Sequence, residues 1–189
     1  MTLGYTTGVF DLFHIGHLTL LRNASALCAR RVVGDTTDEL HRREKQKHSV
    51  IPHHERMEIV REAAESLNLA VLEKAGVEAD DIIATLAKDY SKKGYEVTVV
   101  SSDKDLMQLI DDKVTMYDAM KNKIVGEAEV IEKFNVKPDR VLDLLSLMGD
   151  ASDNVPGVRG IGPKTAAELL NEHGDLEAIF QNLDKVKQK

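Results

Sequence analysis

The sequence contains a single cysteine, Cys28, and no tryptophan. One cysteine excludes an internal disulfide framework and a zinc site rich in cysteine ligands. No stretch resembles a signal peptide, and no apolar run is long enough to span a membrane. Aromatic residues make up only 4% of the 189 residues, whereas 42% are hydrophobic, which is enough for a core. We therefore expect a soluble, cytoplasmic protein with no membrane contact.

An excess of basic residues is also missing, because the net charge is −7. The first 65 residues hold nine Lys/Arg and nine Asp/Glu, and the remaining residues hold 16 Lys/Arg against 23 Asp/Glu. Six of the seven histidines lie in the first 54 residues. This net charge excludes a protein whose whole surface is basic and binds nucleic acid, but it allows a local basic surface beside an acidic metal site. The change of composition near residue 65 indicates two segments of different character.

The hydrophobic pattern predicts an α/β protein. Strands are expected at Leu3–Thr7 and Arg31–Thr36, and helices at Ile15–Cys28 and His54–Leu67. This alternation predicts a Rossmann-like parallel sheet with covering helices. Further along are a strand, a hairpin and four helices, at 96–101, 113–124, 126–134, 138–148, 163–172 and 176–183. We expect an α/β domain over 1–125, followed by an all-helical region over 126–189.

Acidic residues follow the predicted strand Glu96–Ser101, where Asp103 and Asp105 come directly after it. Sites in open parallel sheets form at the carboxyl ends of strands. Glu78, Asp80 and Asp81 open the preceding helix and are expected at the same edge. Carboxylates gathered in this way favour Mg²⁺ or Mn²⁺. The alternative is a set of solvated acids, since a helix dipole favours acids in its first turn.

A glycine-rich turn follows a second pair of acids, Asp150 and Asp153. Glycines stand at 157, 160 and 162, and Pro163 and Lys164 then open a helix. Such a turn points backbone N–H groups and a helix N-terminus at a phosphate. The pattern favours a site that holds a nucleic-acid strand beside a metal. The alternative is a linker between two helices with solvated acids.

The stretch GDASDNVPGVRGIGPKTA (149–166) resembles the helix–hairpin–helix signature of the 5′ nuclease domains of bacterial DNA polymerase I. VEADDIIATLA (77–87) and VVSSDKDLMQLI (99–110) resemble two further signatures of that family. The resemblance extends from about Arg61 to the C-terminus. It implies a metal-dependent 5′-3′ exonuclease or flap endonuclease that acts on a DNA flap or 5′ end regardless of sequence.

The same resemblance implies residue roles. Catalysis is assigned to Asp81, Asp103, Asp105 and Asp150. The metal ligands are Glu78, Asp80, Asp81, Asp103, Asp105, Asp150 and Asp153. DNA contacts are assigned to Arg159, Gly160, Gly162 and Lys164. The hairpin 155–162 is a candidate site for a monovalent cation.

The N-terminal segment has a different resemblance. TTGVFDLFHIGH (6–17) and TTDELHRREKQK (36–47) are similar to the cytidylyltransferase family. That resemblance implies CTP or another nucleotide as a ligand, bound by Thr7, His14, His17 and a lysine, Lys45 or Lys47. Two imidazoles at the mouth of a helix can donate to phosphates, whereas the alternative is a helix cap with solvated histidines. The family's second phosphate loop, Arg-x-x-Gly-Ile-Ser-Thr, is absent, so we expect no cytidylyltransferase turnover.

Neither resemblance is complete, because the strand ending in a metal-binding Asp and the basic helical arch that open the nuclease family are absent. We therefore hypothesise an engineered chimera with little or no activity. Residues 1–61 would be cytidylyltransferase-like and 62–125 nuclease-like, in one continuous sheet. The alternatives are a natural fusion, a nucleotide-binding cytidylyltransferase-like protein, and a hybrid fold with no selected function. Arg31 and Asp35 are charged where apolar residues are expected, which suggests a strand face or edge that is no longer covered by other residues and whose charges discourage aggregation. The alternative is that Asp35 replaces the missing metal-binding Asp.

Overall fold

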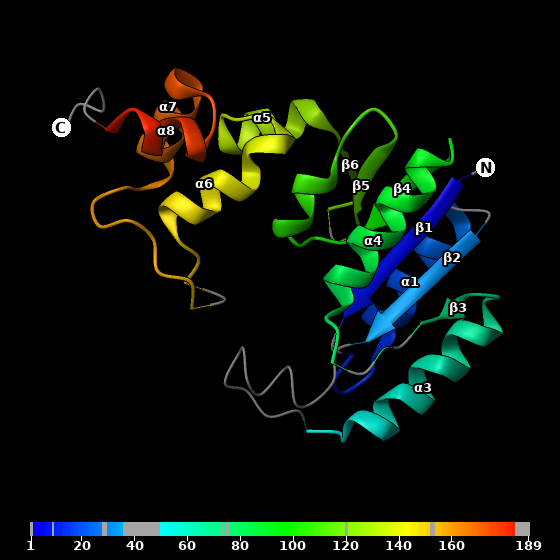
Figure 1. The fold of residues 1–189 in the computed structure, drawn as a ribbon. Helices are drawn as coiled ribbons and strands as arrows, with labels where there is room; N and C mark the ends of the chain where they lie inside the picture. The colour runs from blue at the N-terminus through cyan, green and yellow to red at the C-terminus, as the bar shows by residue number, and fades with distance from the viewer. Residues whose placement is uncertain are drawn as a thin grey trace. The chain divides into compact units, whose positions relative to one another are not determined.

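The fold was analysed in a computed structural model, in which the chain divides into two compact units, Met1–Val125 and Gly126–Lys189 (Figure 1). The structure describes residues 2–8, 10–27, 30–35, 50–72, 74, 76–119, 121–151 and 154–183. Within these ranges, no helix is long and apolar enough to cross a membrane.

The first unit is built on a sheet with six strands among the described residues. The strands are β1 (Thr2–Gly8), β2 (Arg30–Asp35), β3 (Ala70–Val71), β4 (Glu96–Val100), β5 (Val114–Asp118) and β6 (Lys123–Val125). Their order across the sheet is β3-β2-β1-β4-β5-β6. The neighbouring strands β3 and β2, β2 and β1, β1 and β4, and β4 and β5 pair in parallel, and β6 pairs antiparallel with β5. The sheet is therefore mixed, which supports the expected α/β class but not the expected Rossmann-like parallel sheet.

Strand β1 lies between β2 and β4, so strands from both sequence segments form one continuous sheet, as expected. Thr6 is level with Val33 of β2 on one side and with Val100 of β4 on the other. β2 is itself flanked by β1 and β3. β2 is therefore not the edge strand, although β3 pairs only with Val32 and Val33 and not with Arg31 or Asp35. Their side chains lie outside the part of the chain that the structure describes.

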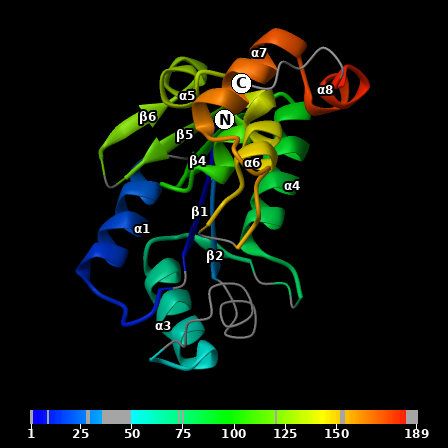
Figure 2. The ribbon, with the colours of Figure 1, turned by 90° about the vertical axis from the view of Figure 1, so that its left-hand side faces the viewer.

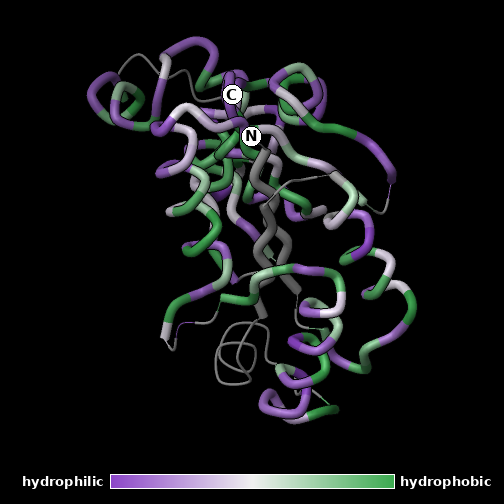
Figure 3. The backbone as a smooth tube through the Cα atoms, turned by 90° about the vertical axis from the view of Figure 1, so that its right-hand side faces the viewer, coloured by the Kyte–Doolittle hydropathy of each residue, from purple (hydrophilic) through white to green (hydrophobic). Residues whose placement is uncertain are grey.

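The helices of this unit cover both faces of the sheet. They are α1 (Ile15–Leu27), α3 (His53–Ser66) and α4 (Ala79–Lys92), with a short 3-10 helix, η1 (Asp105–Leu109). Figures 1 and 2 show α1 and α4 on opposite faces. This follows from right-handed crossovers, because β1–α1–β2 and β3–α4–β4 cross the sheet in opposite directions. Both helices alternate hydrophobic and hydrophilic stretches, as Figure 3 shows.

Two groups of apolar side chains fill the core of this unit. Phe10, Leu21, Val60, Ala64 and Leu69 form a buried cluster that joins the loop after β1 to α1 and α3. The second group consists of buried apolar residues of the neighbouring strands β4 and β5, namely Val97, Val99, Val100, Val114 and Met116.

The predicted hairpin 113–124 is confirmed as β5 and β6. In its turn, Lys121 Nζ lies 3.0 Å from Oδ2 of the buried Asp118.

The second unit is helical apart from one isolated bridge in its described residues. It contains α5 (Glu127–Phe134), the 3-10 helix η2 (Pro138–Arg140), α6 (Val141–Met148), α7 (Pro163–His173) and α8 (Leu176–Gln181). Arg140 pairs with Asp143 at 3.8 Å and with Asp175 at 3.9 Å. Asp143 Oδ2 also accepts a hydrogen bond from the backbone N–H of Leu176. These contacts fix the start of α8 against the start of α6.

We expect Leu144→Ala to destabilise this unit by roughly 2–5 kcal/mol, because the Leu144 side chain is fully buried and its removal leaves a cavity. Leu142 lies on the same helix with 57% of its surface exposed, so Leu142→Ala should change the free energy of unfolding by less than about 0.5 kcal/mol. Urea denaturation followed by circular dichroism measures both. Equal losses from the two variants would contradict the burial assigned to α6.

Candidate metal and DNA-binding sites

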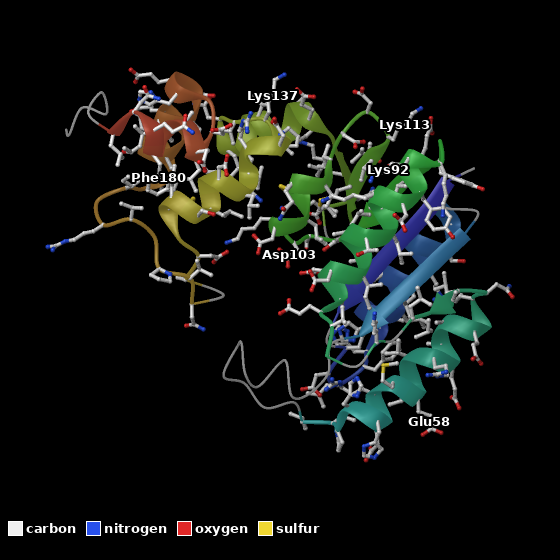
Figure 4. All side chains as sticks on the ribbon, viewed as in Figure 1. Glu58, Lys92, Asp103, Lys113, Lys137 and Phe180 are labelled. Carbon is white, nitrogen blue, oxygen red and sulfur yellow. The ribbon has the colours of Figure 1, made fainter. Side chains whose placement is uncertain are left out.

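The turn after β4 carries the first two predicted metal residues. The backbone N–H of Asp103 donates to Ser101 Oγ at 3.0 Å, and the N–H of Asp105 donates to Asp103 Oδ1 at 3.0 Å. Ser101 N–H donates in turn to the carbonyl of Tyr117, which ties the turn to β5. Half-buried Asp103 and Asp105 are therefore held at the carboxyl end of β4, where the sequence predicted them. Figure 4 shows Asp103 at the other end of this unit from Lys92 and Lys113.

The other predicted ligands of the first unit open α4. Glu78 is the N-cap of that helix, and Asp80 and Asp81 lie in its first turn. Helix α4 packs against β4 and η1, so both acidic segments belong to neighbouring elements. Among the described residues, however, no three His, Cys, Asp or Glu side chains form a group that could hold a metal ion. Because Asp153 lies outside the described residues and Asp150 belongs to the second unit, the seven-residue ligand set stays a prediction.

A closed loop connects α6 to α7 in the second unit. Asp150, only 8% exposed, exchanges two backbone hydrogen bonds with Val155, at 2.9 and 2.8 Å. The N–H of Val158 donates to the carbonyl of Leu147 at 2.8 Å, which folds the loop back on α6. Gly149 has φ +76°, and a Cβ there would lie 2.3 Å from the backbone nitrogen of Gly157. The loop therefore depends on a backbone contact that only glycine permits.

The predicted DNA contacts lie at the end of this loop. Arg159, Gly160, Gly162 and Lys164 are all exposed. Gly162 is the N-cap of α7 and supplies no side-chain cap, and Pro163 stands at the first helical position. The residues Pro163, Lys164 and Thr165 that begin α7 are exposed, and an exposed helix start that carries a lysine is an arrangement that suits a phosphate. That DNA binds there, or a monovalent cation within 155–162, stays a prediction.

The two predicted nucleotide-binding histidines stack at the start of α1. Their ring centroids are 4.0 Å apart with an interplanar angle of 23°. Burial lowers the pKa of His17, and the neighbouring His14 lowers this pKa further. Thr7 lies in β1 but its side chain is outside the described part of the chain, as are Lys45 and Lys47 altogether. The structure thus brings His14 and His17 together but does not place the remaining members of that set.

Asp11 is a residue that the sequence reasoning missed. Its carboxylate accepts hydrogen bonds from the backbone N–H groups of Leu12, Val50 and Ile51, at 3.1, 2.8 and 3.0 Å. These hydrogen bonds, that from Ile51 most strongly, lower the pKa of Asp11. The carboxylate joins the loop after β1 to the segment before α3. No sequence signal reveals this, because the partners are backbone groups 39 and 40 positions away.

Two family models match the chain. The model of the 5′-3′ exonuclease N-terminal resolvase-like domain covers residues 39–135, and that of the 5′-3′ exonuclease C-terminal SAM fold covers residues 136–189. The first match begins well before Arg61, where the sequence analysis placed the start of the nuclease-like part. It therefore corrects that boundary.

Individual relatives agree with the family models. The chain is 52% identical over 130 residues to DNA polymerase I of Rhizobium leguminosarum, covering 69% of this chain and 13% of that protein. It is 40% identical over 131 residues to a 5′-3′ exonuclease of Aquifex aeolicus, covering 69% of this chain and 45% of that protein. The chain thus spans less than half the length of these two relatives.

One solved structure with the same fold is the D15 flap endonuclease of bacteriophage T5, in a pseudo-enzyme-product complex with DNA and metal ions. The TM-score is 0.76 at 21% identity, over 100% of this chain and 81% of that one. The likeness in fold includes the N-terminal segment. None of these findings supports a cytidylyltransferase half, CTP as a ligand or an engineered chimera. The two family models together cover the chain from residue 39 to its end, and the chain belongs to the 5′-3′ exonuclease family.

Proposed function

We propose that this chain binds DNA at a 5′ end or flap and cleaves it with the help of Mg²⁺ or Mn²⁺. The observation that supports this most is the acidic turn Ser101–Asp105, which follows the central strand β4 and adjoins α4, whose first turn is also acidic. The flap endonuclease of bacteriophage T5, which shares the fold, was solved with DNA and metal ions. We propose that this chain likewise binds DNA and metal ions.

The proposed metal ligands are all carboxylates, and oxygen-only donor sets fit Mg²⁺ or Mn²⁺ rather than zinc. Asp103 and Asp105 would hold the metal together with Glu78, Asp80 and Asp81 of the first unit. Asp103 Oδ1 is engaged in the turn, which orients the other carboxylate oxygen of that residue. When bound, divalent ions supply an activated water and stabilise the leaving oxygen of a phosphodiester.

The loop between α6 and α7 is proposed to hold the DNA backbone. Arg159 and Lys164 supply positive charge, and the backbone near Gly160 and Gly162 supplies N–H donors to phosphate oxygens. Contacts of this kind carry no sequence information, and their strength falls steeply as salt rises. We therefore propose DNA binding that is independent of sequence.

A labelled duplex with a 5′ flap tests the proposal. Cleavage is expected with Mn²⁺ or Mg²⁺ and not in EDTA, whereas a gel shift in EDTA should still report binding. Lys164→Glu should weaken binding across all sequences and reduce the salt slope by about 1, as loss of one phosphate contact predicts. The matched control is Lys92→Glu, which changes an exposed lysine at the end of α4. If neither cleavage nor a gel shift occurs with the intact chain, the proposed function is wrong.

A further inference from the structure

The start of α1 is capped by two histidines in a reciprocal arrangement. The carbonyl of His14 accepts from Leu18 N–H at 3.2 Å, which makes His14 the N-cap residue. His14 Nδ1 accepts from Gly16 N–H at 3.0 Å, and the backbone N–H of His14 donates to His17 Nδ1 at 3.4 Å. This is a variant of the capping box, in which Ser or Thr and Glu or Gln usually supply the two acceptors, because the N-cap side chain accepts from the second helical residue rather than the third. Here both acceptors are imidazole nitrogens.

The geometry dictates the protonation of both rings. A nitrogen that accepts a hydrogen bond carries no proton, so each neutral imidazole must hold its proton on Nε2. An imidazolium has donors on both nitrogens and cannot accept. A charged ring would also stand at the positive end of the helix dipole. The cap is therefore compatible only with two neutral histidines.

The cap is packed onto the apolar core. His17 contacts Phe10 edge-on, with ring centroids 5.3 Å apart, and lies 5.5 Å from Phe13. Phe10 is only 2% exposed and belongs to the core cluster with Leu21. A Cβ at Gly16 would lie 2.7 Å from His14 Cε1, so glycine is what allows the ring of His14 to fold over the first turn. Loss of the cap would therefore disturb the packing of Phe10 as well as the helix start.

We propose that His14 and His17 form a proton-sensitive cap, which releases the first turn of α1 and the loop 10–14 when the imidazole of His17 takes up a proton. This inference goes beyond the proposed function. The cap lies at the same end of the sheet as the acidic turn of the proposed metal site. This is because β1 and β4 are adjacent and parallel, with Thr6 level with Val100, so the loop after β1 and the acidic turn after β4 both follow the carboxyl ends of their strands.

The surrounding charges do not replace the histidines as the titrating groups. Asp11 lies in the same loop, and its lowered pKa keeps the carboxylate ionised throughout the range in which histidines titrate. From α3, Arg56 interacts with Asp11 and donates to the carbonyl of Ile51. The start of α3 also carries a short charged and titratable run, His53, His54 and Glu55. β1 has no charged residue, and α1 adds only Arg22, which lies further along the helix.

The direction of the pH effect follows from the lowered pKa of His17. As the pH falls, the unfolded chain takes up the proton before the folded chain does. The contribution of the cap to the stability of the helix start is therefore complete above the ordinary histidine pKa of about 6.5. The contribution is lost as the pH falls from there through the lowered pKa of the folded protein. Within that window, the protection of the Gly16 and Leu18 amides against hydrogen exchange should fall about tenfold per pH unit. The amide of Ala166, in the first turn of α7, should show no such fall.

The experiment compares the wild-type chain with a double variant, His14→Asn with His17→Gln. Asn at the N-cap and Gln three residues later keep both acceptors but do not titrate. We expect this variant to keep its protection at pH 7.5 and to lose the acid-induced fall. His54→Gln removes an exposed histidine at the start of α3 and should behave as the wild type does.

A second measurement does not depend on any variant. The ¹⁵N shifts of the wild-type imidazoles should show protons on Nε2 alone at pH 7.5. A proton on Nδ1 of either ring at that pH would overturn the proposal. The same acid-induced fall in the double variant and in the wild type would overturn it as well.

Discussion

Gly149→Ala should destabilise the second unit by roughly 4 kcal/mol, because two independent costs coincide at this position. The residue has φ +76°, which strains any side chain. A Cβ would also lie 2.3 Å from the nitrogen of Gly157 and 2.8 Å from the carbonyl oxygen of Val155. Both neighbours are backbone atoms that hold the closed loop, so they cannot move aside without breaking it. Urea denaturation followed by circular dichroism measures the loss.

Two other glycines separate the two costs. Gly160 has φ +84° but nothing within 4 Å of its Cβ position, so Gly160→Ala should cost only about 1–2 kcal/mol. Gly162 has neither feature, and Gly162→Ala should cost at most about 1 kcal/mol, the preference for glycine over alanine at the N-cap of α7. A ranking in which Gly149→Ala costs no more than Gly160→Ala would show that the chain does not make this close approach.

Asp103→Asn should lower the rate of metal-dependent flap cleavage by at least about 100-fold, since even residues that only support metal ligands cost 10–100-fold. The reason lies in the turn after β4, where Asp103 is fixed by Ser101 and fixes Asp105 in turn. Asparagine keeps an oxygen that can accept from the N–H of Asp105, so the turn should survive. The measurement is single-turnover cleavage of the labelled flap at saturating enzyme with Mn²⁺.

Asp112→Asn is the matched control for this variant. Asp112 is an exposed acid just before β5, next to Lys113, and thus at the amino end of the sheet (Figure 4). The same loss of charge there should leave cleavage unchanged. Gel shifts in EDTA should be the same for both variants, which separates an effect on cleavage from an effect on DNA binding. Equal activity of the two variants would remove Asp103 from the proposed metal site.

The elements with regular patterns could be predicted from the sequence. The apolar run Val97–Val100 marked a central strand, and the acids Asp80 and Asp81 marked the start of α4, because both signals are local. The sequence also predicted the hairpin of β5 and β6. It did not reveal that β5 pairs in parallel with β4 and so joins the hairpin to the sheet, since that pairing is tertiary.

Long-range polar contacts could not be predicted. Met57, Val60 and Ala64 form the apolar buried face of α3 at helical spacing, but Arg56 is also fully buried, against the usual preference of a charged residue for solvent. Asp11 is engaged by Val50 and Ile51, whose distance along the chain hides the contact from any local pattern.

The candidate sites were predicted in part. Motif position placed Asp103 and Asp105 at the end of β4, because this follows from strand direction alone. Their grouping with Asp150 depends on how side chains and the two units meet, which no spacing in the sequence determines. The resemblance to cytidylyltransferases is supported by none of the comparisons. The histidine motif is nevertheless a real local structure, a helix cap.

The central position of β1 has a consequence for how the chain folds during synthesis. β1 leaves the ribosome before β4, yet Thr2 pairs with Glu96, so one of its two neighbours is made about ninety residues later. Until then β1 can pair only with β2, and its other edge remains open. Contacts of such long sequence separation slow folding, because loop-closure entropy is lost before they form. The first unit is therefore expected to complete its sheet late, after α4 and β4 have been translated.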